Sequence, residues 1–237
     1  MGIPISLTII AFSALIHASF QLSVSVLTLL SAHTIGTKRS QVKLLKLTTS
    51  FVFGVGVMTL LLLSFIALVF INVFDGKIPQ IAWAAVCGLS FGVAIVVWLF
   101  YYRRQKGTML WISRGFADYL NRRTESTRLS AEAFGLGLSS VISEILFIIA
   151  PLSISALVLI YLPPLWQLVG IGLYTLISML SLIIVWISIS GGHNLSRIQK
   201  WRENNKYFLQ FAAGAGLIVL GFFVYVNEII VSLVGKF

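Results

Sequence analysis

Residues 48–73 read TTSFVFGVGVMTLLLLSFIALVFINV. The stretch contains no charged side chain, and its apolar residues would cover every face of a helix. A helix needs about 20 mostly apolar residues to cross the hydrocarbon core of a bilayer. The strands of a membrane β-barrel are about ten residues long and alternate apolar with polar side chains. The stretch therefore predicts a membrane-spanning α-helix.

Five further stretches have the same length and character. With the first, they predict six transmembrane helices at residues 5–30, 48–73, 79–102, 133–160, 165–190 and 209–234. The composition agrees, because the 237 residues are 58% hydrophobic and only 10% charged, whereas a soluble domain is about 25% charged. Such a surface must be solvated by lipid. We therefore predict an all-α integral membrane protein.

The basic residues indicate the orientation of the chain in the membrane. The net charge is +10, and 15 of the 17 Lys and Arg residues lie in three connections, at 38–46, 103–128 and 197–206. All three connections fall on one side of a six-helix protein, and basic loops face the cytoplasm. The pattern predicts a prokaryotic cytoplasmic membrane protein with both termini outside. It also indicates anionic lipid, and no nucleic acid, as the partner of the basic loops.

The central connection has features of a helix of its own. Apolar residues recur at helical spacing between Met109 and Leu120, with basic residues on the other faces. This is typical of a short helix that lies in the membrane interface. It divides the chain into a first three-helix half (1–106), a cytoplasmic interfacial helix and linker (107–132) and a second half (133–237). The interfacial helix serves either to hold anionic lipid or to dock a partner membrane protein.

A short motif, G-x-G-x-x-T-L, occurs in the second helix of each half, at 54–60 and 170–176. Because each half has three helices, the two copies run in opposite directions through the membrane. Inverted repeats of this kind are common in transporters, with the binding site near the midplane. We therefore predict two inverted three-helix repeats. Small residues let helices approach closely, so we expect close contacts or hinges at Gly54, Gly56, Gly170 and Gly172, and a close contact at the GxxxG of Gly88 and Gly92.

Polar side chains lie inside the first and fourth predicted helices. Ser13, His17 and Gln21 are spaced by four residues, as are Ser140 and Glu144, so each set shares one helix face. An unpaired polar group is costly in hydrocarbon, and these faces must therefore meet other helices or a water-filled cavity. Glu144 is the only acidic residue well inside a predicted span, and intramembrane ionisable groups are usually functional.

These residues predict a site for substrate or coupling near the midplane. Its members are His17, Gln21 and Glu144, with Ser13, Ser140 and Thr175. A His17–Glu144 pair would bind a cation, relay a proton or hold a small solute. The structural alternative is a hydrogen bond from a protonated Glu144. Pro151 lacks an N–H group, so we also expect a break or hinge in the fourth helix there.

The sequence offers no enzyme motif. It contains one cysteine, Cys87, three scattered histidines and no P-loop, nucleophile elbow or H-E-x-x-H motif. We therefore expect no catalytic residue, no metal site and no cofactor.

The layout resembles a known superfamily, the LysE-like exporters and their CcdA-type relatives. The resemblance rests on six helices in two inverted halves, both ends outside, and a glycine-rich second helix in each half. The CcdA branch implies a cysteine in the first and fourth helices, where this chain has His17 and either Ser140 or Glu144. The amino-acid exporter branch implies an early Gly-Pro motif, where this chain reads Ile16-His17-Ala18-Ser19-Phe20-Gln21. The resemblance thus implies export without thiol redox chemistry.

Two functions follow from these observations. The first is a small secondary transporter that exports a small solute or cation through the midplane site. The second is a non-transporting membrane subunit that binds or stabilises a partner membrane protein, or forms a homodimer. Flux that depends on Glu144 would select the first, and stoichiometric co-purification without flux would select the second.

Overall fold

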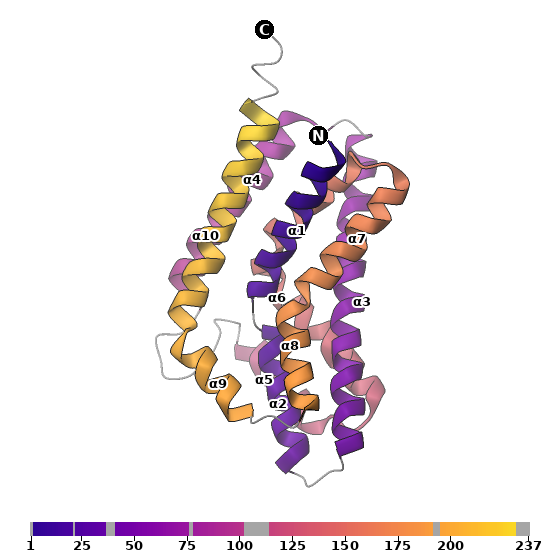
Figure 1. The fold of residues 1–237 in the computed structure, drawn as a ribbon, viewed down its shortest axis with the longest axis vertical. Coiled ribbons are helices and arrows are strands. Elements are labelled where there is room, and N and C mark those ends of the chain that lie inside the picture. The colour runs from indigo at the N-terminus through magenta and orange to yellow at the C-terminus, as the bar shows by residue number, and fades with distance from the viewer. Residues whose placement is uncertain are drawn as a thin grey trace.

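A computed structural model describes residues 2–20, 22–36, 41–75, 78–101, 114–191 and 195–230. Every element in this part of the chain is a helix (Figure 1). The helices are α1 (Ile3–Ser19), α2 (Leu22–Gly36), α3 (Gln41–Phe74), α4 (Gln80–Phe100), α5 (Arg114–Ser126), α6 (Ser130–Ile160), α7 (Pro164–Ser178), α8 (Leu180–Ser190), α9 (Leu195–Asn204) and α10 (Lys206–Val224), the last continued by a π-helical turn, Tyr225–Ile230.

Four of these elements are long and apolar enough to cross a membrane alone: α3, α4, α6 and α10 with its π-helical turn. Two bent pairs, α1 with α2 at 44° and α7 with α8 at 52°, are also long and apolar enough when each pair is taken together. The all-α class is confirmed for the described residues, which contain four candidate membrane spans, or six if each bent pair counts as one.

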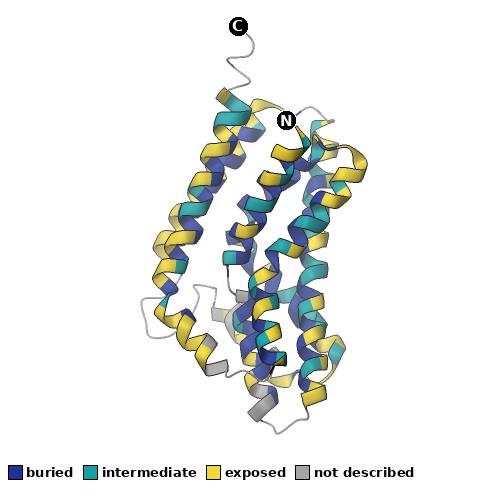
Figure 2. Ribbon diagram, viewed as in Figure 1, coloured by how far each residue is buried: buried dark blue, intermediate teal, exposed yellow. Residues whose placement is uncertain are grey.

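The outer surface is that expected for lipid contact. Figure 2 shows buried residues on the inward faces of the helices and exposed residues on the outward faces. Many of the exposed side chains are large and apolar, including Phe53, Phe65, Leu146, Leu165 and Phe211. Exposed apolar area on this scale marks a surface that is covered by lipid or by another protein.

The helix breaks are not where the sequence predicts them. α6 runs without interruption through Pro151, which corrects the expected break. A proline is tolerated in a membrane helix when neighbouring helices enclose it, and residues 150–159 of α6 are all buried. The breaks instead lie at Phe20, whose backbone is extended, and at Met179. No glycine or proline marks either position.

The first break is held by aromatic packing. Phe20 is buried, and its ring stacks on Phe147 of α6 with centroids 5.8 Å apart. The ring of Tyr101 lies edge-on to both, at 5.5 Å from Phe20 and 4.9 Å from Phe147. Offset and edge-on ring pairs add to the free energy of burial. The break between α1 and α2 is therefore fixed by tertiary contacts and not by a local sequence signal.

The backbones of α3 and α6 touch. A Cβ atom on Gly54 would collide with the carbonyl of Phe134, and one on Gly137 would collide with the carbonyl of Phe51. The close contact predicted at Gly54 is confirmed. Its partner, Gly137, belongs to no motif in the sequence.

A second close pair is α4 with α10. Gln210 Nε2 donates to the carbonyls of Val97 and Trp98, at 2.7 and 2.9 Å, and Ser90 Oγ donates to the carbonyl of Leu217 at 2.8 Å. The close contact predicted at Gly88 and Gly92 is wrong within this chain. Both are exposed, and a Cβ on either would meet no atom of the described residues within 4 Å. The buried face of α4 is the opposite one.

We expect Gln210→Leu to lower stability, because the carbonyls of Val97 and Trp98 lose a donor in an apolar interface. An unsatisfied buried polar group costs about 1–3 kcal/mol, which corresponds to a fall in Tm of roughly 2–12 °C in a chain of this size. Thermal unfolding in detergent at a fixed scan rate measures it. Gln199→Leu is the matched control, because Gln199 is exposed on α9. Equal melting of the two variants would contradict the proposed bridging role.

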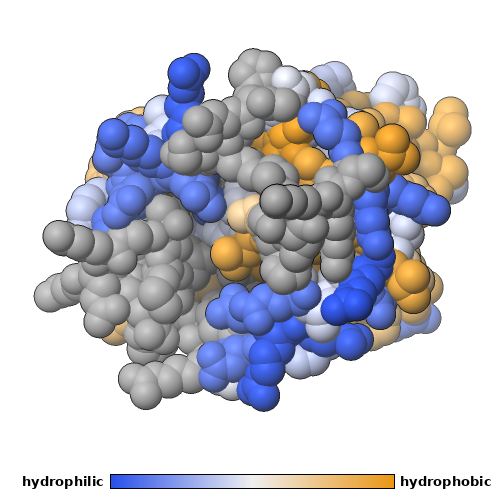
Figure 3. All heavy atoms as spheres, turned by 90° about the horizontal axis from the view of Figure 1, so that it is seen from below, coloured by the Kyte–Doolittle hydropathy of each residue, from blue (hydrophilic) through white to orange (hydrophobic). Residues whose placement is uncertain are grey.

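The basic connections gather at one end of the bundle. The start of α1 and the end of α10 lie at the opposite end from the start of α3, α5 and α9 (Figure 1). The exposed basic side chains at that end include Lys43, Lys46, Arg123, Arg128 and Arg197. Figure 3, which looks at this end, shows hydrophilic side chains around apolar ones.

The predicted interfacial helix corresponds in part to α5. Residues 109–113 lie outside the described residues, and α5 begins at Arg114. Leu120 is buried, whereas Asp118 and Arg122 are exposed, so the helix is amphipathic. The start of the second half, predicted at residue 133, falls in the first turn of α6.

Candidate functional site

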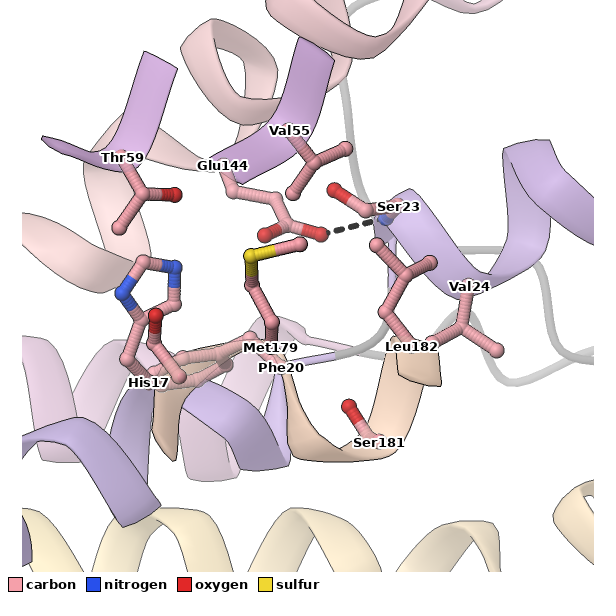
Figure 4. A pocket seen from close by; sticks show the side chains of 11 residues that line it. His17, Phe20, Ser23, Val24, Val55, Thr59, Glu144, Met179, Ser181 and Leu182 are labelled. Carbon is pink, nitrogen blue, oxygen red and sulfur yellow. Dashed lines mark hydrogen bonds between the residues drawn. The ribbon is translucent and has the colours of Figure 1, made fainter. Parts of the chain in front are cut away.

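A cavity lies inside the bundle where the two helix breaks meet α3 and α6 (Figure 4). Its volume is about 20 Å³, and one water molecule needs roughly 10–15 Å³ in the same measure. In this conformation the cavity therefore holds a species no larger than a water or a monatomic ion. It is lined by His17, Phe20, Ser23, Val24, Val55, Thr59, Glu144, Ser178, Met179, Ser181 and Leu182.

Glu144 projects from the middle of α6 and is 3% exposed. Its Oε1 accepts a hydrogen bond of 2.6 Å from the backbone N–H of Ser23, drawn as the dashed line in Figure 4. Ser23 is the second residue of α2, and the first N–H groups of a helix have no partner within it. The carboxyl group of Glu144 therefore caps the start of a half-helix. Ser140, one turn earlier on α6, lies 3.2 Å from Ser23, Oγ to Oγ.

His17 lies in the last turn of α1 and is 5% exposed. Its Nδ1 is 3.0 Å from the hydroxyl of Tyr174 on α7, with the rings tilted at 54°. Tyr174 is fully buried. This bond joins the two bent helix pairs and orients the imidazole of His17, which lines the cavity. In Figure 4 the ring lies beside Thr59.

The second halves of both bent spans begin at the cavity. Ser23 and Val24 belong to the first turn of α2, and Ser181 and Leu182 belong to the first turn of α8. Ser181 Oγ donates to the carbonyl of Ala18 at 2.8 Å, so the start of α8 also satisfies the end of α1. Two helix N-termini, which carry partial positive charge, therefore border the same small space.

Thr59 of α3 stands out among the buried threonines. It is 1% exposed, and its hydroxyl is directed into the cavity (Figure 4). It has no hydrogen-bond partner among the described residues. The other buried threonines donate to a carbonyl three or four residues earlier: Thr28, Thr34, Thr48, Thr124, Thr127 and Thr175.

The predicted site residues come together only in part. His17 and Glu144 line the same cavity, but the hydrogen bonds just described go to Tyr174 and Ser23 and not between the two. Ser140 reaches the cavity through Ser23. Thr175 donates to its own helix, and within the described residues Ser13 Oγ is buried without a partner. Neither lines the cavity, and Gln21 lies outside the described residues.

The predicted hinge glycines have different surroundings. A Cβ on Gly56 would press on the side chain of Met179, at the second break. A Cβ on Gly170 would press on the side chains of Leu159 and Ile10, and one on Gly172 would meet no described atom within 4 Å. Gly56 and Gly170 therefore allow close packing, whereas Gly172 has open space beside it.

Some residues of the site carry a weak signal in the sequence. In a continuous helix, Ser23 would not share a face with Ser13 and His17. The break at Phe20 rotates α2 relative to α1, and this brings Ser23 to the cavity. Thr59 belongs to the repeated motif, which predicts packing and gives no hint of a free hydroxyl. Met179 is apolar and lies between Ser178 and Ser181, and only these weak helix formers indicate the second break.

The class that these features define is an all-α protein with long apolar helices compatible with a bilayer and a polar cavity at two helix breaks. Comparisons with protein-family models, with curated proteins and with solved structures found no match. Function resides in sites rather than folds, so the function must be inferred from the chemistry of the cavity.

Proposed function

We propose that the chain is a small secondary transporter that exports a small solute across a cytoplasmic membrane. The observation that carries the proposal is the cavity at the two helix breaks, with the carboxyl group of Glu144 buried beside it. Secondary transporters commonly bind substrate at interrupted membrane helices near the midplane. An ionisable group in that position indicates a functional site.

The pattern of helix contacts supports an inverted repeat. If the first three spans are equivalent to the last three, α3 against α6 should correspond to α7 against α1, and both pairs are in contact. The contact of α4 with α6 likewise corresponds to that of α10 with α1. The glycines agree in part, because Gly54 faces α6 and Gly170 faces Ile10 of α1 as well as Leu159 of α6. This symmetry would let the two halves move against each other about the cavity.

The grouping of charge supports the sidedness. The exposed basic residues lie at the end opposite the start of α1 and the end of α10 (Figure 1). With basic loops in the cytoplasm, both termini would be outside and the basic end would lie against anionic lipid. The resemblance to LysE-like exporters remains a prediction.

The size of the cavity is that of a closed state. A space of about 20 Å³ admits no solute larger than a water-sized species, so a larger substrate would need the halves to part. Met179 lies against Gly56 of α3, and this contact between the halves would have to open.

Two measurements test the proposal. Mass spectrometry of the full chain, released from mild detergent, identifies any bound solute or partner. Proteoliposomes then measure flux of that solute, with empty liposomes as the blank. Flux above the blank supports the proposal, and a stoichiometric protein partner without any flux would replace it.

The alternative, a subunit that binds another membrane protein or a second copy, has one observation in its favour. Gly88 and Gly92 are exposed on α4, and a Cβ on either would meet no described atom within 4 Å. A GxxxG pair allows another helix to approach closely. Gly92→Leu would then abolish association on a sizing column.

A further inference from the structure

We propose that the starts of α2 and α8, with Thr59, form a binding site for a small monovalent anion, whose place the carboxylate of Glu144 takes in this conformation. The inference rests on the proposed function in that the anion would be the exported solute. Binding itself can be measured without transport.

The start of α2 already binds a carboxylate. Glu144 Oε1 lies 2.6 Å from the N–H of Ser23, a short bond of the kind made when the acceptor is charged. A helix N-terminus combines free N–H groups with the positive end of the helix dipole, which is why anions bind there. α2 is 15 residues long, long enough to have a developed dipole. The Glu144 side chain thus marks a position where an anion is stabilised.

The start of α8 faces the same space and is not capped. No side chain caps this helix, and the hydroxyl of Ser181 is used by the carbonyl of Ala18. Ser181 and Leu182 line the cavity. A second positive helix end therefore borders the cavity opposite α2, with its N–H groups unanswered by a side chain.

Thr59 supplies the independent indication of a ligand. Its hydroxyl is buried, is directed into the cavity and has no partner among the described residues. An unpaired buried hydroxyl is costly, and the other buried threonines avoid the cost by bonding to their own helices. The hydroxyl of Thr59 is therefore placed to donate to something inside the cavity. His17 lines the same cavity.

The charges favour an anion over a cation. Two helix N-termini present positive ends to the cavity, and its one carboxyl group already accepts from Ser23. A cation would lie beside both positive ends. An anion would gain from them, but it would be repelled by an ionised Glu144 in so small a volume. The anion and the carboxylate should therefore exclude each other.

Binding is tested with two variants at constant ionic strength, with gluconate as the bulky replacement anion. In Glu144→Gln the repelling charge is removed, and an anion displaces a neutral amide from the Ser23 N–H more easily than a carboxylate, so we expect chloride to bind at least tenfold more tightly than to the wild type. In Glu144→Ala the carboxylate position is vacated, and we expect formate to raise Tm saturably. Glu132→Gln is the matched control, because Glu132 lies on the exposed first turn of the same helix and should leave chloride binding as in the wild type.

Thr59 is tested in the Glu144→Ala background. Thr59→Val should weaken formate binding about tenfold, whereas Thr175→Val should not, since the Thr175 hydroxyl bonds to Ile171. If neither Glu144 variant responds to chloride or formate while both remain monodisperse and helical, the cavity holds water only and the inference is wrong. Anion binding without flux would leave the inference standing and refute transport, and flux of a solute without anion binding would do the reverse.

Discussion

Glu144→Gln should abolish transport and leave the protein folded. Glutamine has the shape of glutamate and can still accept the hydrogen bond from Ser23 N–H, so the start of α2 stays capped. The exchange removes the negative charge, and with it the ability of the side chain to take up a proton or pair with an ion. If Glu144 binds or couples, flux in proteoliposomes should fall at least tenfold. Yield and Tm in detergent should stay close to those of the wild type, because the exchange removes no packing.

The control for this prediction lies on the same helix. Glu132 caps the first turn of α6, where its Oε2 accepts from the N–H groups of Arg128 and Leu129 at 2.7 and 3.0 Å. Glu132→Gln makes the same chemical change at an exposed position and should retain full flux. Unchanged flux in Glu144→Gln would reduce Glu144 to a structural cap of α2. A large fall in Tm together with lost flux would also indicate that Glu144 is a structural cap.

The sequence predicts the spans well because hydrophobic length is a local property. The stretch 48–73 is contained in α3, and 79–102 and 133–160 match α4 and α6 within a few residues. The burial of His17 and Glu144 is also predictable, since a polar side chain at that depth must face inward. Both side chains line one cavity, as expected if the polar faces of the first and fourth predicted helices pack toward each other.

The break at Phe20 and the continuity of α6 through Pro151 could not be predicted, because nothing local causes either. Pro151 is the residue whose chemistry favours a break, yet α6 continues through it inside a ring of neighbours. Phe20 has no such chemistry, yet its extended backbone is held by Phe147 and Tyr101 from distant parts of the chain. The break at Phe20 also changes the partners of His17 and Glu144, which the sequence predicts to pair with each other. With the break at Phe20, Ser23 is the residue that reaches Glu144, and Tyr174 is the residue that reaches His17.

Gly54→Ala should destabilise the protein, although the same change stabilises most helices. In an ordinary helix interior, alanine is favoured over glycine by about 0.5–1 kcal/mol. At Gly54 the added Cβ would meet the backbone carbonyl of Phe134, and a backbone atom cannot move aside as a side chain can. Overpacking of this kind costs about 1–3 kcal/mol, so the net effect should be a fall in Tm of up to about 10 °C. Gly137→Ala should behave in the same way, because its Cβ would meet the carbonyl of Phe51.

Gly88→Ala makes the same change where a Cβ meets no described atom, and it separates packing from helix propensity. Only the propensity term applies there, so the variant should melt at the wild-type temperature or slightly above it. The Tm of Gly56→Ala should lie between those of Gly54→Ala and Gly88→Ala, because the flexible side chain of Met179 can shift. Thermal unfolding of all four variants at one scan rate gives the order. Destabilisation by Gly88→Ala as large as by Gly54→Ala would mean that the exposed face of α4 is itself packed, against a second copy or a partner helix.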